Sequence, residues 1–108
     1  MPILFDQGTP LSLRDSLHEH VVKTAHQQGW STLLNGELLR AADQAGFDVL
    51  VTTDKNLVCQ QNLSGRKIAI VVLGRNRWSL IRSTLPGIAS AVNAAKPGSH
   101  TLVEVPDR

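Results

Sequence analysis

The sequence of 108 residues contains few of the residues that identify several common classes of protein. Its single cysteine, Cys59, excludes a disulfide within the chain and a zinc site built from several cysteines. Its longest apolar run, 68–73, is far shorter than the roughly 20 residues of a membrane-spanning helix. The first residues also lack the basic and apolar segments of a signal peptide. We therefore expect a cytoplasmic protein with no membrane contact, folded as one domain over residues 1–108.

Acidic residues are missing from most of the second half of the chain. Residues 1–54 contain seven acidic and three basic residues, whereas residues 55–108 contain two acidic and eight basic residues. No carboxylate lies between Lys55 and Val103, although the net charge of the whole chain is only +2. An acidic segment joined to a basic one suits a metal-dependent reaction on a polyanion.

The pattern of apolar residues predicts alternating strands and helices. Runs rich in β-branched residues predict strands at 3–5, 20–24, 47–52, 68–73 and 101–105, the last of them an edge strand. Helical spacing predicts helices at 9–17, 37–45 and 79–96, with one or two further turns at 56–61. We expect Thr9 to cap the first helix, Gly46 to end the second and Pro86 to interrupt the third. This order is typical of an α/β fold.

Three carboxylates fall where such a fold binds ligands. Asp6 and Asp54 follow two different predicted strands, and Glu37 begins a helix that follows a strand. Because ligands bind outside the carboxyl ends of parallel strands, the three side chains can meet at one edge of the sheet. Crowded carboxylates repel one another unless a hard cation such as Mg²⁺ or Mn²⁺ neutralises them. A simpler interpretation is equally open, since an aspartate after a strand often forms a turn and a glutamate in a first helical turn complements the helix dipole.

Four segments in order resemble a known family. They are Ile-Leu-Phe-Asp-Gln at 3–7, Gly-Trp-Ser at 29–31, Asn-Gly-Glu-Leu-Leu at 35–39 and Val-Leu-Val-Thr-Thr-Asp-Lys-Asn at 49–56. Together they resemble the short bacterial PIN-like proteins, which are related to PIN-domain toxin ribonucleases. The resemblance implies a PIN-like three-layer α/β fold, with a central, mainly parallel sheet of about five strands and helices on both faces.

The same resemblance assigns site residues. It implies a divalent-metal ribonuclease site with Asp6, Glu37 and Asp54 as the catalytic acids, and we expect these three to hold Mg²⁺ or Mn²⁺ together with Asn56. Related proteins often carry further acids where this chain has Gln7, Asn56 and the segment 74–77. The smaller set of carboxylates leaves open a catalytically degenerate protein.

Basic residues follow the predicted strand at 68–73 and thus lie at the same edge as the acids. We expect Arg75, Asn76 and Arg77 to contact the phosphates of an RNA substrate. Trp78 can stack on a base or anchor its helix in the core, and packing is the more common role of a lone tryptophan.

The resemblance to PIN-like proteins, taken with the three carboxylates, therefore implies an enzyme, a divalent-metal-dependent endoribonuclease that is the toxin of a type II toxin–antitoxin module. Its expected partners are RNA, a cognate antitoxin and, as a possibility of the fold, a second copy of the chain. The alternative is a degenerate PIN-like module that binds RNA or protein. A receiver-like phosphoacceptor with Asp54 as the acceptor ranks lower, because receivers need a pair of acids after the first strand and a lysine after a late one.

Overall fold

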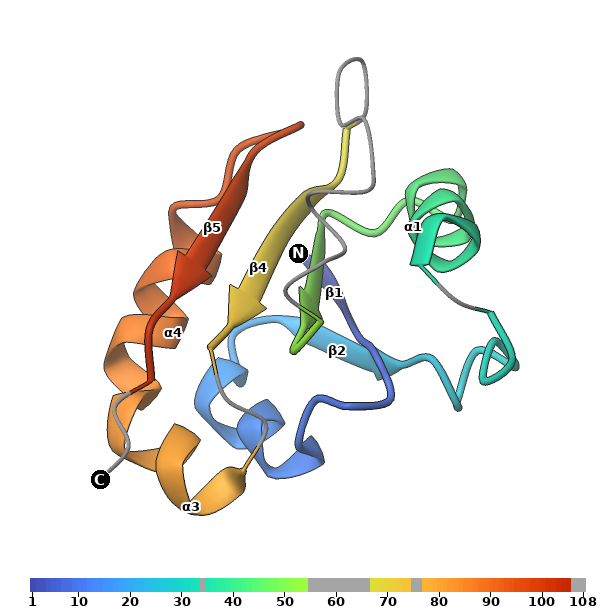
Figure 1. The fold of residues 1–108 in the computed structure, drawn as a ribbon. Helices are drawn as coiled ribbons and strands as arrows, with labels where there is room; N and C mark the ends of the chain where they lie inside the picture. Colours follow the sequence, from blue (N-terminus) through green and yellow to red (C-terminus); the bar gives the residue numbers. More distant parts are fainter. Residues whose placement is uncertain (34, 55–66, 75–76, 106–108) are drawn as a thin grey trace.

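The chain forms an α/β fold around a five-stranded sheet in the computed structural model, which describes residues 1–33, 35–54, 67–74 and 77–105 (Figure 1). All of its strand pairs are parallel. The strands are β1 (Pro2–Phe5), β2 (Val21–Thr24), β3 (Val49–Thr52), β4 (Ala69–Leu73) and β5 (His100–Val103). The helices are the 3₁₀ helix η1 (Leu11–Leu17), α1 (Asn35–Gln44), α3 (Trp78–Ile81), the 3₁₀ turn η2 (Arg82–Thr84) and α4 (Leu85–Asn93).

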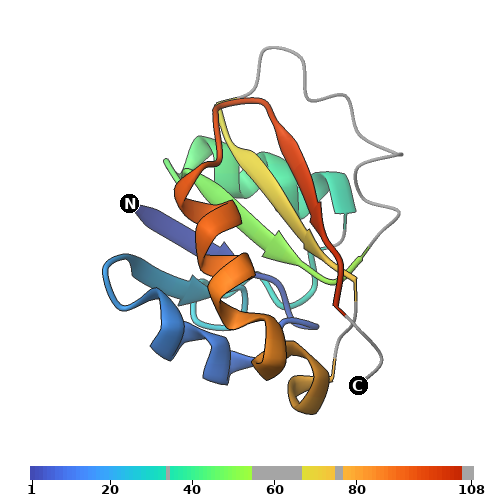
Figure 2. The same ribbon diagram turned by 90° about the vertical axis from the view of Figure 1, so that its left-hand side faces the viewer.

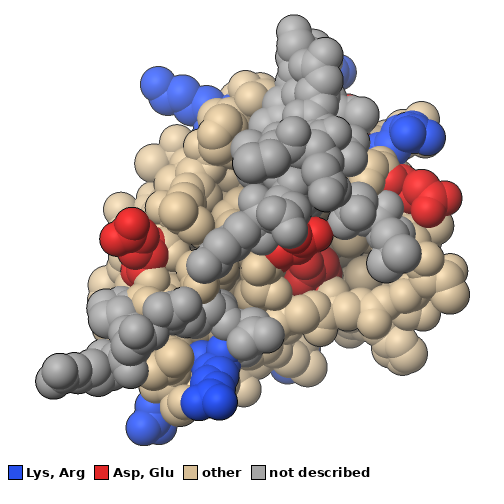
Figure 3. All heavy atoms as spheres, in the orientation of Figure 1, with Lys and Arg blue, Asp and Glu red and all other residues tan. Residues whose placement is uncertain are grey.

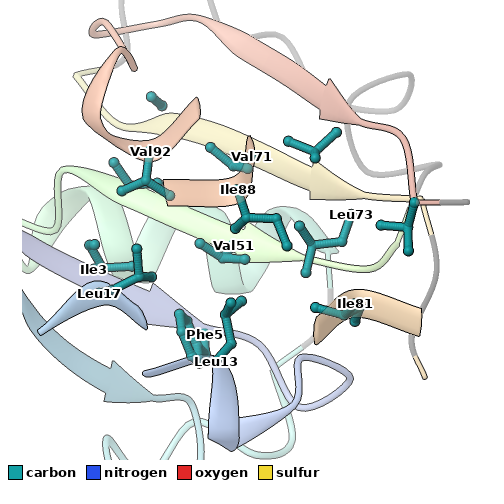
Figure 4. Packing of buried hydrophobic residues seen from close by; sticks show 14 residues of the cluster. Ile3, Phe5, Leu13, Leu17, Val51, Val71, Leu73, Ile81, Ile88 and Val92 are labelled. Atoms are coloured by element: carbon teal, nitrogen blue, oxygen red, sulfur yellow. The ribbon is translucent and has the colours of Figure 1, made fainter. Parts of the chain in front are cut away.

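Helices cover both faces of the sheet, which confirms the expected three-layer α/β class and is consistent with a PIN-like fold. Figure 2 shows α4 in front of the sheet and α1 behind it. Alternate side chains of a strand point to opposite faces, and the core is accordingly divided into two clusters. One cluster joins the sheet to η1, α3 and α4, and Figure 4 shows it with the sheet residues Ile3, Phe5, Val51, Val71 and Leu73 against Leu13, Leu17, Ile81, Ile88 and Val92.

The second cluster lies under α1 and explains why the inner strands are apolar throughout. Leu4, Leu50 and Ile70 point to this face and pack with α1 residues that include Leu39 and Ala42. Strands covered on both sides have no solvent face, so every residue of β3 and β4 is buried. Burial of each large side chain contributes about 1.5–3 kcal/mol to folding.

The order of the strands places a crevice between β1 and β3. The order is β2-β1-β3-β4-β5, so the chain passes from β1 to β2 on one side and then crosses to β3 on the other. Such a reversal is a topological switch point, where open parallel sheets bind their ligands beyond the carboxyl ends of the strands. Asp6 follows β1 and Asp54 lies two residues after β3, so both residues lie beside this crevice.

The five predicted strands and the three predicted helices at 9–17, 37–45 and 79–96 agree with the structure apart from details at their ends. The helical turns predicted at 56–61 lie outside the described residues. β5 is an edge strand, and α1 ends before Gly46, whose φ of 88° suits glycine. The break in the third predicted helix falls at 82–84, because Pro86 occupies the first turn of α4, where its missing N–H costs no hydrogen bond. The prediction that Thr9 caps the first helix was wrong, since no side chain caps η1 and Thr9 bonds elsewhere. No helix in the described part of the chain is long and apolar enough to span a membrane.

Candidate functional site

Asp6 is held firmly at the end of β1. Its backbone N–H donates to the carbonyl of Val51 at 3.1 Å, which fixes the turn against β3. Its Oδ1 accepts hydrogen bonds from the Gly8 N–H at 3.1 Å and the Thr9 hydroxyl at 2.7 Å. Its Oδ2 accepts a hydrogen bond from the hydroxyl of Thr52. These donors hold the carboxylate of Asp6 in a single orientation.

Thr52 joins the two aspartates of the site. Its side chain is 1% exposed, so its hydroxyl needs internal partners. The hydroxyl donates to Asp6 Oδ2 and accepts the backbone N–H of Asp54 at 3.0 Å. A side chain at the end of β3 thereby orients the acid of β1 and also fixes the start of the turn that carries Asp54. The one hydroxyl of Thr52 therefore serves both acids.

Asp6 and Asp54 line one pocket of about 210 Å³. Its polar wall also includes Gln7, Gly8 and Ser31, while its apolar wall is formed by Ala25, Leu33 and Leu38. The pocket thus brings together two of the three predicted catalytic acids, one from each side of the switch point.

The side chain of Gln7 is bound to the loop between β2 and α1. Its Nε2 donates to the backbone carbonyl of Ser31, which closes one side of the pocket. A carboxylate cannot donate a hydrogen bond, so an acid at this position would leave the carbonyl without this partner. The residue at position 7 therefore has a defined structural role in the pocket wall.

Glu37 does not share the pocket of Asp6 and Asp54. It lies exposed in the first turn of α1, whereas the next residue, Leu38, faces the pocket. Within the described residues no group of three histidine, cysteine, aspartate or glutamate side chains could hold a metal ion. The structure brings together two of the predicted ligands, and a role for Glu37 remains a prediction.

The residues predicted to contact RNA are only partly described. Arg75, Asn76 and the fourth predicted metal ligand, Asn56, lie outside the described residues. Arg77 is exposed immediately before α3, at the carboxyl edge of the sheet. Trp78 is half-buried and packs against the core cluster under α4, as the packing interpretation predicted.

The described charges are distributed around the molecule. Figure 3 shows acidic side chains at separate places on this face, and basic side chains both at its upper end and at its lower end, where Figure 1 places α3. The described basic residues next to α3 are Arg77 and Arg82, both exposed. A polyanion bound at the carboxyl edge would therefore find cations beside β4 and carboxylates beside β1 and β3.

Sequence reasoning missed Thr9 as a residue of the site. A signal was present, because an aspartate followed two residues later by glycine favours a turn in which the carboxylate accepts backbone N–H bonds. Thr9 is buried, and its hydroxyl lies 3.0 Å from the carbonyl of Val51 as well as near Asp6. The hydroxyl has one proton, so it supports only one of these acceptors at a time.

Comparison of the chain with protein-family models, with curated proteins and with solved structures finds no match.

Proposed function

We propose that the protein is a divalent-metal-dependent endoribonuclease that acts as the toxin of a type II toxin–antitoxin module. The observation that carries the proposal is the shared pocket of Asp6 and Asp54 at the switch point of a parallel sheet. The ordered resemblance of four segments to PIN-like proteins supports the substrate class. RNA and a cognate antitoxin are then its partners, and the cytoplasm is its compartment.

The donor set of the pocket fits Mg²⁺ or Mn²⁺. A carboxylate offers about four lone-pair positions, and the described donors to Asp6 are Gly8, Thr9 and Thr52. One position remains on Oδ2, which is sufficient for a single bond to a cation. Mg²⁺ in proteins is usually held by one or two carboxylates, with water and substrate phosphate completing its shell. Asp6 and Asp54 would hold the ion, which when bound supplies a water nucleophile and neutralises phosphate charge.

The chain's own residues would perform the remaining tasks. Thr52 and Thr9 keep the carboxylate of Asp6 in place, so little reorganisation is needed when a substrate enters. The apolar wall formed by Ala25, Leu33 and Leu38 gives the pocket a surface suited to a ribose or a base. The exposed Arg77 lies at the same edge of the sheet, where a guanidinium can hold a neighbouring phosphate.

A second candidate function is a degenerate module that binds RNA or protein without cleaving it. The internal hydrogen bonds of Asp6 favour this function, because three donors already use its carboxylate. Gln7 adds no charge to the pocket, and its side chain is held by the carbonyl of Ser31. A receiver-like phosphoacceptor needs a second acid beside Asp6. The neutral Gln7, bound to the Ser31 carbonyl, occupies that position and argues against this function.

The decisive experiment compares the wild type, Asp6→Asn and Asp43→Asn in a cleavage assay with labelled single-stranded RNA and Mn²⁺. Asp43 is the matched control, because it also accepts backbone hydrogen bonds but lies at the opposite end of the sheet. We expect Asp6→Asn to lose cleavage by about a hundred-fold or more, since one of the few ligands is removed. Asp43→Asn should cleave at the wild-type rate.

A chelator separates the two candidate functions. Cleavage by the wild type that stops with EDTA and returns with Mn²⁺ supports the nuclease. RNA binding of equal affinity in the wild type and Asp6→Asn, with no cleavage by either, supports the binding module. Growth arrest on expression of the wild type but not of Asp6→Asn tests the toxin role separately.

A further inference from the structure

Among the described residues, no strand pairs with the outer edge of β5. The carbonyl of Ser99 accepts a hydrogen bond from the backbone N–H of Ile70 in β4 at 3.0 Å. The carbonyl of Val103 accepts one from the N–H of Gly74, directly after β4, at 2.9 Å. In a parallel sheet, every second residue of a strand directs its backbone hydrogen bonds to the same neighbouring strand. The backbone N–H and C=O groups of residues 100, 102 and 104 therefore point away from the sheet. Figure 2 shows that α4 does not pass in front of β5.

The side chains of this edge are also open to solvent. His100, Leu102 and Glu104 are exposed, and Leu102 is among the most exposed large apolar residues described, at 53%. Because these residues are two apart, their side chains share one face of the sheet. An edge with three outward-facing backbone positions and an exposed leucine at its centre is suited to the addition of a strand.

The opposite edge of the sheet, β2, is closed by its own chain. The backbone N–H groups of Val21 and Ala25 donate to the carbonyls of Met1 and Phe5 in and next to β1. The backbone groups of residues 22 and 24 therefore point outward, away from β1. The outward N–H of Thr24 donates to Gln27 Oε1 at 3.0 Å, and its carbonyl accepts the N–H of Gln28 at 3.1 Å. Lys23 lies within the strand, and lysine on an edge discourages pairing. Of the two outward-facing residues of β2, Thr24 is thus bonded on both backbone groups within the described part of the chain, which leaves Val22 for pairing.

We propose that a second copy of this chain pairs with the outer edge of β5, antiparallel and centred on Leu102. A two-fold axis at this residue places Leu102 opposite Leu102 of the other copy, and it places His100 opposite Glu104 at both ends. The edge is thus self-complementary, with an apolar pair in the middle and an imidazole that can donate to a carboxylate on each side. All three pairs are of the hydrogen-bonded type, because their backbone groups face outward.

The dimer forms independently of the proposed nuclease activity, because β5 lies at the edge of the sheet and the pocket lies between β1 and β3. The contact is narrow, so we expect a weak dimer with a Kd between about 10 µM and 1 mM. Sedimentation velocity over that range of concentration measures it directly. A wild type that stays monomeric up to about 1 mM would overturn the proposal.

Matched substitutions at the two edges test the location of the interface. Leu102→Lys places two like charges opposite each other and should raise the Kd about ten-fold or more. Val21→Lys, at a residue of β2 that is 59% exposed, should leave the Kd unchanged. Far-UV circular dichroism and thermal melts of the monomers check that both variants are folded. An unchanged Kd in Leu102→Lys, or a loss of dimer in Val21→Lys, contradicts the assignment.

The register has its own test. His100→Glu puts two glutamates together at each end and should weaken the dimer, while His100→Glu combined with Glu104→Lys restores opposite charges and should restore the Kd. In a Cys59→Ser background, Leu102→Cys should form a disulfide with its own copy, because paired Cα atoms lie about 5.5 Å apart. Thr101→Cys has no such partner in this register and should cross-link poorly. Equal cross-linking of the two variants would exclude the register.

Discussion

The two ends of the parallel sheet use aspartate side chains in different ways. At the amino end, Asp43 on α1 accepts the backbone N–H groups of Lys67 and Ile68, at 3.3 and 3.1 Å, and so attaches the helix to the approach to β4. At the carboxyl end, Asp6 accepts bonds from two hydroxyls and one backbone N–H and also lines a pocket. A hydrogen-bonded aspartate therefore does not identify a site, whereas one held by side-chain hydroxyls beside a second carboxylate at the switch point is a strong candidate.

Removing the hydroxyl of Thr52, which joins the two aspartates at the carboxyl end, should cause the largest loss of stability among the changes considered at the two ends of the sheet. Thr52→Val keeps the shape of a buried side chain but leaves the Asp54 N–H without its acceptor and Asp6 Oδ2 without its donor. We expect the free energy of unfolding to fall by about 2 kcal/mol, measured by urea denaturation. The Mn²⁺-dependent rise in melting temperature should also fall, because Asp6 is no longer oriented. Thr52→Ser retains the hydroxyl and should keep the Mn²⁺ response, although it loses a buried methyl group.

Asp43→Ala should lower the stability of the protein through the amino end of the sheet and leave the pocket at the carboxyl end unchanged. Two backbone N–H groups lose a charged acceptor in a half-buried position, so we expect a loss of about 1.5 kcal/mol in the free energy of unfolding. Because Asp43 is remote from the pocket, RNA cleavage measured well below the melting temperature should stay at the wild-type rate. A drop in cleavage parallel to that of Asp6→Asn would show that the two ends are not independent.

The fold was largely predictable because its signals are local. Continuous apolar runs predicted the buried strands, Gly46 predicted the end of α1, and the rule for parallel strands predicted that Asp6 and Asp54 would meet. The order of the strands was not predictable in the same way. The apolar run at 68–73 predicts a strand that is covered on both faces. Its residues do not indicate which strands are its neighbours, so its place between β3 and β5 could not be predicted.

The finer geometry of the site depended on choices that the sequence leaves open. The hydroxyl of Thr9 could cap a helix or bind Asp6, and both uses need the same residue at the same place. The position of Glu37 depends on the rotation of α1 about its axis, which burial of Leu39 and Ala42 determines. That rotation leaves Glu37 exposed and turns Leu38 toward the pocket.

Gln7→Glu should shift the balance between stability and metal binding at the carboxyl end. The new carboxylate cannot donate to the Ser31 carbonyl, so we expect a loss of about 1 kcal/mol in the absence of metal. It also adds a negative charge beside Asp6 and Asp54, so the rise in melting temperature with Mn²⁺ should exceed that of the wild type. Gln7→Met is the control, because it removes the donor without adding charge. A Gln7→Glu variant with wild-type stability in EDTA would show that the Ser31 bond contributes nothing.

The smallest expected effect concerns the close approach of Gly8 to Thr53 in the turn after β1. A Cβ at position 8 would lie 2.6 Å from Thr53 Oγ1 but 3.9 Å from Thr53 Cβ, so only the hydroxyl obstructs it. Gly8→Ala should therefore destabilise the wild type slightly, by less than about 0.5 kcal/mol, because rotation of Thr53 offsets the entropy gained in the unfolded chain. In a Thr53→Ala background the obstruction is gone, and the same substitution should stabilise the protein by about 0.4–1 kcal/mol. A double-mutant cycle by urea denaturation measures this change of sign, and additive effects would mean that the two residues do not touch.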